Sequence, residues 1–198
     1  MSGTFPTSPA PSAMSLRSIQ PSLVSVSHSL KRQTRSRGGQ RWGFALQYRN
    51  RTRAQMAELI SFAIAQQGQY GTFTYVPTTI GNPQTTVTGT PLCAGATASG
   101  RSITTDGWAI SSTVMLAGDF IKFASHAKIY MLTSDVTTNG SGEATLAIEP
   151  ALYSAVADNE ALTVSSIPFT VAFGADTHEI ALGQGGVFDW SCELVESP

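Results

Sequence analysis

The chain has 198 residues, of which 41% are hydrophobic and 13% are charged. A chain of this length can bury the core of one large β domain or of two small ones. No apolar run approaches the roughly 18 residues of a membrane-spanning helix, and Met1 to Gln20 lacks the apolar core of a secretory signal, so the sequence predicts neither. Gly, Ser, Thr and Ala take the place of charged residues, which is typical of strands joined by many turns and suits a subunit covered by neighbours.

Charge is divided unevenly along the chain. Between Met1 and Ala57 there is no acid, and the nine bases are Arg17, Lys31, Arg32, Arg35, Arg37, Arg41, Arg49, Arg51 and Arg53. From Glu58 onward there are three bases and all thirteen acids, so the two parts carry +9 and −10. Three interpretations are a nucleic-acid patch, head-to-tail stacking of a basic face on an acidic face, and ordinary solvation. The acidic remainder would repel phosphate, so sequence-specific nucleic-acid binding is not expected.

The N-terminal part begins with a Pro- and Ser-rich segment, residues 1–21, which predicts a flexible tail. Apolar and polar residues then alternate from Val24 to Leu30, which predicts a half-buried strand. His28 falls on the apolar side of this strand, where a hydrogen-bonded core histidine is favoured over a ligand. Arg37-Gly38-Gly39 supplies a turn, and a second strand from Gln40 to Asn50 completes the predicted hairpin. Its apolar face consists of Trp42, Phe44, Leu46 and Tyr48.

One helix is expected directly after this hairpin, at about residues 53–67. Thr52 and Gln55 have the spacing of a capping box, and Gly68 suits the residue that ends the helix. The apolar stripe of the helix consists of Met56, Leu59, Ile60, Ala63 and Ile64, at a spacing of three and four residues. The stripe is expected to lie across the apolar face of the hairpin, and Gly71 to Val76 returns as a strand.

A second β unit follows. Residues 80–112 are Thr-, Gly- and Ala-rich and indicate a linker with weak strands, in which Asp106-Gly107-Trp108 is expected to form a turn. The later strand candidates are Asp119–Phe123, Lys128–Ser134, Ala144–Ile148, Ala161–Val164, Phe169–Phe173 and Glu179–Leu182. Turn residues separate these strands at short intervals, which predicts a small barrel or sandwich.

The last strand, Val187 to Glu196, alternates like the strand from Gln40 to Asn50. We expect it to pair with the N-terminal sheet, so that Asp189 and Glu193 meet the basic face of that sheet. The predicted fold class is therefore mainly β with one amphipathic helix: a β-sandwich-like domain with the helix, at 22–81 plus 185–198, and an inserted small β-barrel or sandwich domain at 82–184.

The residues that carry chemistry do not form a catalytic or metal-binding constellation. His28, His126 and His178 lie in unrelated segments without metal-ligand spacing, and no nucleotide-binding or hydrolase motif is present. Cys93 and Cys192 are expected to be buried free thiols. The sequence thus predicts no catalytic residue, no metal and no cofactor.

Two further patterns have structural explanations. The segment from Asp135 to Glu143 has oxygen donors at the spacing of a calcium loop, but Thr137 and Leu146 stand where that loop needs its key ligands, so a turn is favoured. The aromatic side chains that could form a sugar platform are Trp108, Tyr130, Tyr153 and Trp190. Core packing is favoured for them.

Two stretches resemble a known family. The first stretch is similar to a Trp-bearing strand, a helix and a returning strand in tail proteins of long-tailed bacteriophages. It consists of residues 39–73, GQRWGFALQYRNRTRAQMAELISFAIAQQGQYGTF. The second stretch is similar to the β unit that follows in the same proteins. It consists of residues 117–152, AGDFIKFASHAKIYMLTSDVTTNGSGEATLAIEPAL. The chain thus resembles the distal tail protein family, although its Pro- and Ser-rich start is not part of the pattern.

The resemblance implies a non-catalytic structural protein of the virion, assembled in the host cytoplasm. It implies a ring, usually hexameric, between the tail tube and the distal hub, with residues 22–81 and 185–198 in the ring and residues 82–184 at the periphery, where contact with a host surface is possible. A tail-tube subunit, a head–tail connector subunit and a receptor- or carbohydrate-binding module are the alternatives. No membrane partner is expected.

The sequence also names residues for these roles. The expected assembly interface consists of Arg35, Arg37, Arg41, Arg49, Arg51 and Arg53. The expected core anchors are Trp42, Phe44, Leu46, Leu59, Ile60, Phe188 and Trp190.

Overall fold

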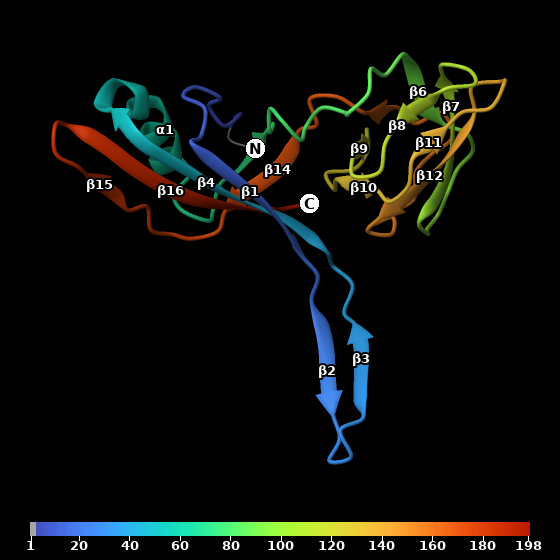
Figure 1. Cartoon of the computed structure of the whole chain (residues 1–198), viewed down its shortest axis with the longest axis horizontal. Coiled ribbons are helices and arrows are strands. Elements are labelled where there is room, and N and C mark those ends of the chain that lie inside the picture. The colour runs from blue at the N-terminus through green and yellow to red at the C-terminus, as the bar shows by residue number, and fades with distance from the viewer. Residues whose placement is uncertain (1–2) are drawn as a thin grey trace. The chain divides into compact units, whose positions relative to one another are not determined.

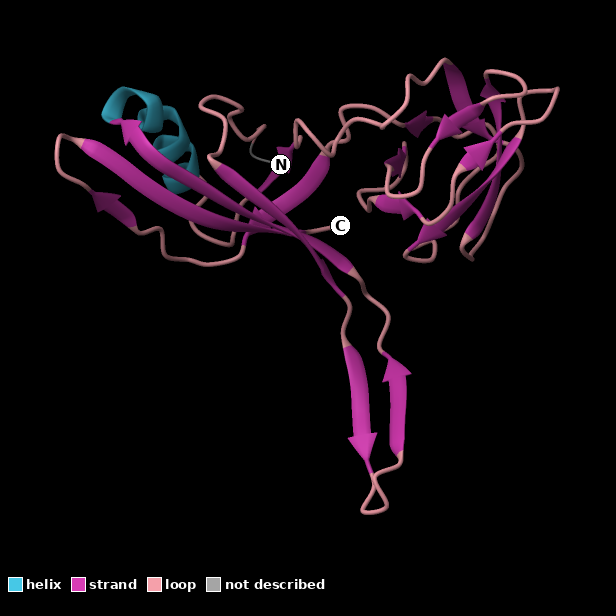
Figure 2. Ribbon diagram, in the orientation of Figure 1, coloured by secondary structure: helices cyan, strands magenta, loops and turns pink. Residues whose placement is uncertain are grey.

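The computed structural model describes residues 3–198, which divide into two compact units (Figure 1). Unit 1 contains the described residues up to Phe73 together with Val171–Ser197, and unit 2 contains Thr74–Thr170. Unit 2 is therefore an insertion into unit 1. Strands predominate in both, as Figure 2 shows, and the structure confirms a mainly β fold with a helix.

Unit 1 is built on a six-stranded sheet in the order β1-β4-β16-β14-β5, with β15 also paired to β16. The strands are β1 (Ala13–Ile19), β4 (Arg41–Thr52), β5 (Thr72–Tyr75), β14 (Phe169–Phe173), β15 (Ile180–Leu182) and β16 (Val187–Glu196). The long antiparallel pairing of β16 with β4 runs from Val187↔Thr52 to Val195↔Gly43. The predicted return of the C-terminal strand to the N-terminal sheet is confirmed.

The helix α1 (Arg53–Ala65) covers one face of this sheet. It starts where predicted, because the backbone N–H of Gln55 donates to Thr52 Oγ1 (3.4 Å) and the N–H of Thr52 donates to Gln55 Oε1 (3.0 Å). Met56, Leu59 and Ala63 are buried against the sheet, and the chain leaves the helix through Gln67 and Gly68, both with positive φ. Ile64 is 65% exposed, so the buried stripe is narrower than predicted.

From residue 3 onward the N-terminal segment is part of the fold, which corrects the expectation of a flexible tail at residues 1–21; Met1 and Ser2 lie outside the described residues. β1 pairs with β4 from Ala13↔Gln47 to Ile19↔Arg41. Phe5 is 1% exposed and its ring packs on Phe62 (5.7 Å between centroids) and Phe73 (5.8 Å). Composition predicted disorder, but one buried aromatic ring and one sheet edge hold the segment.

The predicted hairpin is also wrong in its pairing. β2 (Ser22–Val26) pairs with β3 (Arg32–Ser36), from Ser22↔Ser36 to Val26↔Arg32, and not with the strand that follows the turn. Every residue from 21 to 39 is exposed, so neither the half-buried strand nor the core position of His28 is found. We call residues 21–39 the arm; β1 runs into it and it leads back into β4 (Figure 1).

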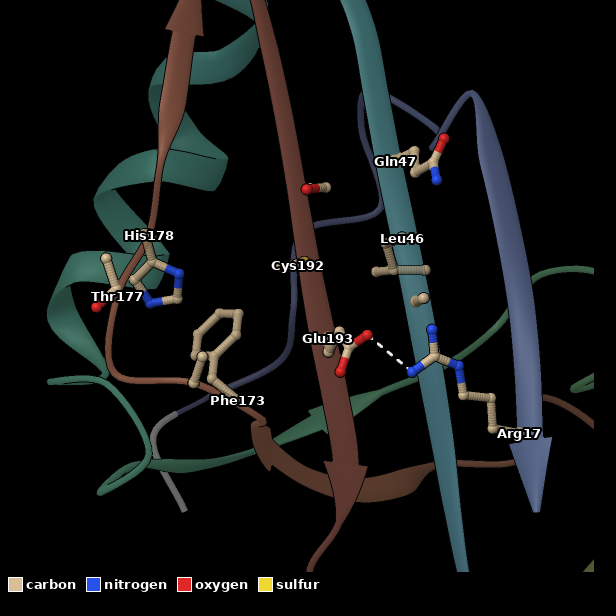
Figure 3. A pocket seen from close by; sticks show the side chains of 11 residues that line it. Arg17, Leu46, Gln47, Phe173, Thr177, His178, Cys192 and Glu193 are labelled. Atoms are coloured by element: carbon tan, nitrogen blue, oxygen red, sulfur yellow. Dashed lines mark hydrogen bonds and ion pairs between the residues drawn. The ribbon is translucent and has the colours of Figure 1, made fainter. Parts of the chain in front are cut away.

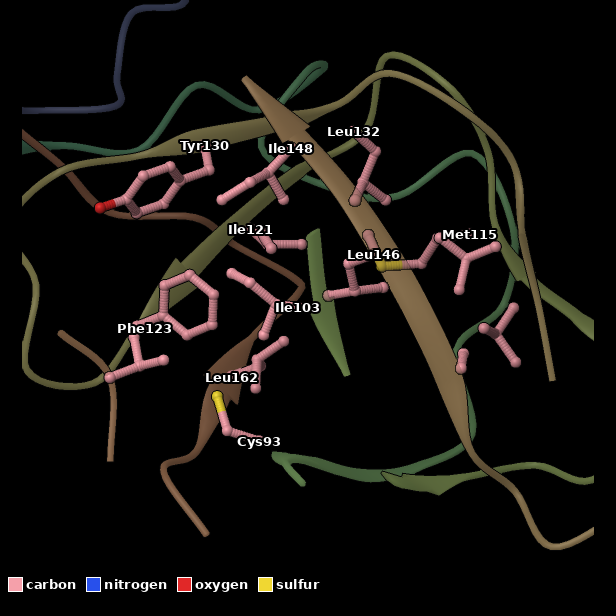
Figure 4. Close-up of a cluster of buried hydrophobic side chains, with 14 of the residues drawn as sticks. Cys93, Ile103, Met115, Ile121, Phe123, Tyr130, Leu132, Leu146, Ile148 and Leu162 are labelled. Atoms are coloured by element: carbon pink, nitrogen blue, oxygen red, sulfur yellow. The ribbon is translucent and has the colours of Figure 1, made fainter. Parts of the chain in front are cut away.

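Unit 2 is a nearly closed, barrel-like sheet in the order β13-β9-β10-β12-β7-β6. Its strands are β6 (Gly89–Cys93), β7 (Ser102–Trp108), β9 (Phe120–Phe123), β10 (Tyr130–Leu132), β12 (Ala144–Glu149) and β13 (Leu162–Thr163), with β8 (Thr113–Met115) and β11 (Val136–Thr137) forming a separate pair. A bridge between Leu92 and Ala161 joins the two ends of the strand order. The core inside includes Ile121, Phe123, Leu146 and Ile148, each at most 1% exposed (Figure 4).

Two strand predictions placed the right strands in the wrong unit. β14 and β15 both pair with β16 in the sheet of unit 1, so the inserted unit ends near Thr170 and not at residue 184. Within unit 2, Asp106-Gly107-Trp108 lies in strand β7, not in a turn. Alternating patterns identify strands, but the partner of each strand is set by the whole topology.

Candidate assembly surface

The arm is a two-stranded hairpin without a core of its own. Its turn is closed by the N–H of Ser27, which donates to Lys31 O (3.0 Å), and by the N–H of Leu30, which donates to Ser27 O (2.9 Å). Leu30 at the tip is 85% exposed, and Leu23, Val24 and Val26 are 51–58% exposed. An isolated hairpin of this kind is marginally stable in water, and exposed apolar side chains on it favour contact with another protein surface.

The arm is also strongly basic. It carries Lys31, Arg32, Arg35 and Arg37 and no acid. None of these four side chains forms an ion pair within residues 3–198. Their charge is therefore available to a partner.

The other arginines of the predicted interface differ in how exposed they are. Arg41 and Arg49 are exposed on β4, and Arg53 is exposed at the first turn of α1. Arg51 is half-buried: its Nη2 donates to the backbone oxygen of Ala10 (2.8 Å), and its Nε is buried without a partner among the described residues. Arg51 therefore helps to hold the N-terminal segment, which is a structural role that the charge pattern alone did not indicate.

The predicted core anchors lie mostly in the interior of unit 1. Trp42, Phe44, Leu46, Leu59 and Trp190 are 0–3% exposed. Ile60 and Phe188 are half-buried. Trp190 stacks on Tyr48 at 5.6 Å between ring centroids, directly across the β16–β4 ladder.

An ion pair crosses the outer face of the same sheet. Arg17 Nη1 donates to Glu193 Oε1 at 2.7 Å, joining β1 to β16 across β4. Both side chains are about half exposed, so water screens the pair and it contributes little to stability. Asp189 instead accepts the backbone N–H of Asn50 (2.6 Å). Glu193 thus meets a base of the N-terminal part of the sheet, as the charge pattern predicts, whereas Asp189 contacts only its backbone.

A hollow of about 270 Å³ opens beside this ion pair (Figure 3). Its lining includes Phe173, Thr177, His178 and Cys192. Burial lowers the pKa of His178 and raises the pKa of the Cys192 thiol to about 12. The thiol is protonated at neutral pH and is therefore a weak nucleophile, so the hollow does not pair a reactive sulfur with an activating group.

Unit 2 contains a hydrogen-bonded chain of side chains around a buried histidine. His126 Nδ1 lies 2.8 Å from Tyr130 Oη, and His126 Nε2 lies 2.8 Å from Ser154 Oγ. Tyr130 Oη also accepts the backbone N–H of Tyr153 (3.1 Å). These bonds satisfy buried polar atoms and hold the segment at residues 153–154 against β10, which explains the position of His126 structurally.

Among residues 3–198, no group of three or more His, Cys, Asp or Glu side chains is arranged to hold a metal ion. The segment from Asp135 to Glu143 forms the connection predicted for it: Asn139 Oδ1 accepts the backbone N–H groups of Ser141 and Glu143, both at 2.9 Å. Cys93 and Cys192 are buried free thiols, as predicted. No described helix is long and apolar enough to cross a membrane.

Comparison with known families identifies unit 2. Residues 80–167 match the family model described as "Distal tail protein pb9, B domain". Unit 2 is thus similar to the B domain of distal tail proteins. The matched residues nearly coincide with Thr74–Thr170 and contain the stretch 117–152 that resembles the family. No curated protein matches the chain.

The resemblance to the distal tail protein family is thereby confirmed, and it implies a structural role at the phage tail tip. The stretch at residues 39–73 lies outside the matched residues, in unit 1. The arm lies outside them as well, and its exposure was not foreseen because alternation shows which residues share a face and not whether that face is covered.

Proposed function

We propose that this distal tail protein is a non-catalytic ring subunit that joins the tail tube to the distal hub, with unit 1 in the ring and unit 2 at its periphery. The resemblance suggests a hexamer. In a ring, every copy contacts its two neighbours through two different surfaces. Such heterologous contacts form a closed ring when the rotation from one copy to the next completes a circle. A host surface remains a candidate partner for unit 2.

The observation that carries this proposal is the opposite charge of the two units. Unit 1 contains nine bases and six acids, whereas unit 2 contains three bases and seven acids. The arm and the exposed bases of β4 contribute most of the positive surface. Complementary potentials orient subunits and exclude wrong pairings, so one kind of subunit can supply both sides of a contact.

The position of β1 supports the same proposal. β1 is the first strand in the order of its sheet. Its sequence, AMSLRSI, contains neither Pro nor Lys, which natural edge strands use to prevent pairing. A terminal strand of this composition favours coverage by a neighbouring subunit.

Sedimentation velocity on the full chain and on the triple variant R41E/R49E/R53E tests the proposal. Arg51 is left unchanged because it bonds to Ala10. We expect the full chain to sediment as one closed oligomer and the variant as smaller species with an unaltered circular dichroism spectrum, since exposed substitutions change stability by about 0.5 kcal/mol or less. A full chain that sediments as a monomer at every concentration would contradict the ring.

A further inference from the structure

We propose that the arm of one copy docks on an acidic patch of unit 2 in a second copy. The patch consists of Asp106, Asp158 and Glu160, which lie on both sides of β6. The inference deepens the proposed function, because it names the partner of the arm and rests on self-assembly of the chain.

The acidic patch has a defined geometry. Asp106 on β7 is paired with Leu92 of β6. On the other side of β6, the backbone N–H of Cys93 donates to the backbone oxygen of Glu160 (2.9 Å), and Asp158 Oδ1 accepts the N–H of Gly95 (2.7 Å). The three residues therefore flank the C-terminal part of β6, and the Glu160 carboxylate accepts the N–H groups of Ser125 (2.8 Å) and Ala157 (3.0 Å).

The charges of these three residues also act on one buried thiol beside them. The pKa of the Cys93 thiol is raised to about 11, first by burial and then by the charges of Glu160, Asp106 and Asp158. None of the three carboxylates forms an ion pair within residues 3–198. Like charges held together in this way are stabilised when a cationic surface covers them.

The arm fits this patch in charge and in chemistry. It presents four bases without an acid, and its exposed Leu and Val side chains have no apolar cover within residues 3–198. It contains no Phe, Tyr or Trp between residues 21 and 39, so it lacks the rings on which nucleic-acid bases stack. These features favour a protein partner over a nucleic acid, and the chain itself carries the acidic counterpart.

The arm can be removed without disturbing the sheet. Ile19 and Arg41 are directly paired at the end of the β1–β4 ladder, so Gln20 and Gln40 lie at the positions where a tight hairpin turn begins. Replacing residues 21–39 by Asn-Gly creates a two-residue loop of the type that antiparallel strands prefer. This arm-less variant is expected to keep both units folded.

The test combines this variant with photo-crosslinking. A photoreactive amino acid replaces Leu30 at the arm tip, or Ile64 on α1 as an exposed control, in an equal mixture of ¹⁵N-labelled and unlabelled full chains. After irradiation, mass spectrometry identifies each linked peptide and shows from its isotopes whether the link joins two copies. We expect Leu30 to link to peptides around Asp106 or Asp158 of another copy, and Ile64 not to do so.

The arm-less variant, examined by sedimentation, separates this inference from the ring itself. We expect it to fold and to lose at least tenfold in assembly affinity. If it assembles as well as the full chain, or if Leu30 links only within its own chain or to other surfaces, the docking inference is wrong while the ring proposal survives. If the full chain does not assemble, both are wrong.

Discussion

The most informative stability prediction concerns Phe5, because this ring decides whether the N-terminal segment is part of the fold. Phe5 is 1% exposed and contacts the rings of Phe62 and Phe73. Phe5→Ala removes a fully buried ring. Such truncations cost about 3–5 kcal/mol when the surroundings cannot collapse, and each lost aromatic pair accounts for about 0.5–1.5 kcal/mol.

The segment before β1 can partly relax, so the lower end of this range applies. We expect Phe5→Ala to destabilise unit 1 by about 3 kcal/mol and to leave unit 2 unchanged. With a urea dependence of about 2 kcal/mol per molar, the unfolding midpoint of unit 1 falls by about 1.5 M. Hydrogen exchange followed by mass spectrometry at increasing urea reads each unit from its own peptides.

Leu30→Ala is the matched control, because Leu30 is 85% exposed at the tip of the arm. It should change the stability of isolated subunits by about 0.5 kcal/mol or less. If Phe5→Ala is equally silent, and the peptides from the N-terminal segment exchange as fast as those of the arm, then the segment is not anchored and the packing argument is refuted.

Three further predictions concern individual residues. Gly107→Ala should destabilise unit 2 by more than about 1 kcal/mol in urea titration. The reason is that Gly107 has φ +75° and an added Cβ would lie 2.4 Å from the backbone oxygen of Thr90. An unchanged stability would contradict the close approach of Gly107 to Thr90. The thiol pKa values of Cys93 and Cys192 are raised to about 11 and about 12. Both thiols should therefore resist a disulfide reagent at about pH 8 in the folded chain and react once the chain is unfolded. Rapid reaction of the folded chain would show that they are accessible thiolates. The folded-state pKa of His178 is lowered, so the unfolded state binds more protons below about pH 6.5 and unit 1 should become less stable as the pH is lowered through that range. His178→Asn should reduce this pH dependence, and an identical stability profile in the variant would exclude His178 as its source.

Local signals in the sequence account for the parts of the fold that were predicted. The Thr52–Gln55 capping box and the spacing of Met56, Leu59 and Ala63 define α1 without reference to the rest of the chain. The alternation in Val187–Glu196 likewise identifies a strand. Its pairing with β4 was predictable because both strands have the same apolar alternation and opposite charges on their polar faces.

The missed features depend on contacts that no local pattern reports. Val24 and Val26 alternate as the residues of β4 do, but nothing covers them within the described chain. β14 and β15 were recognised as strands, yet their partner β16 lies elsewhere in the sequence, so the domain boundary was placed too late. The predicted interface residues also depend on contacts that the sequence does not report. Charge alone assigns Arg49 and Arg51 to the same interface, but Arg49 is exposed whereas Arg51 bonds to the backbone of Ala10 and has a structural role.

Native mass spectrometry of the full chain, at about 0.1 M and about 1 M salt, tests the central claim most directly. The screening length falls from about 10 Å to about 3 Å between these two conditions, so contacts between a basic arm and an acidic patch weaken strongly. The account predicts a single closed oligomer, near six copies, at the lower salt concentration and its dissociation at the higher one. A monomer in both conditions would contradict it.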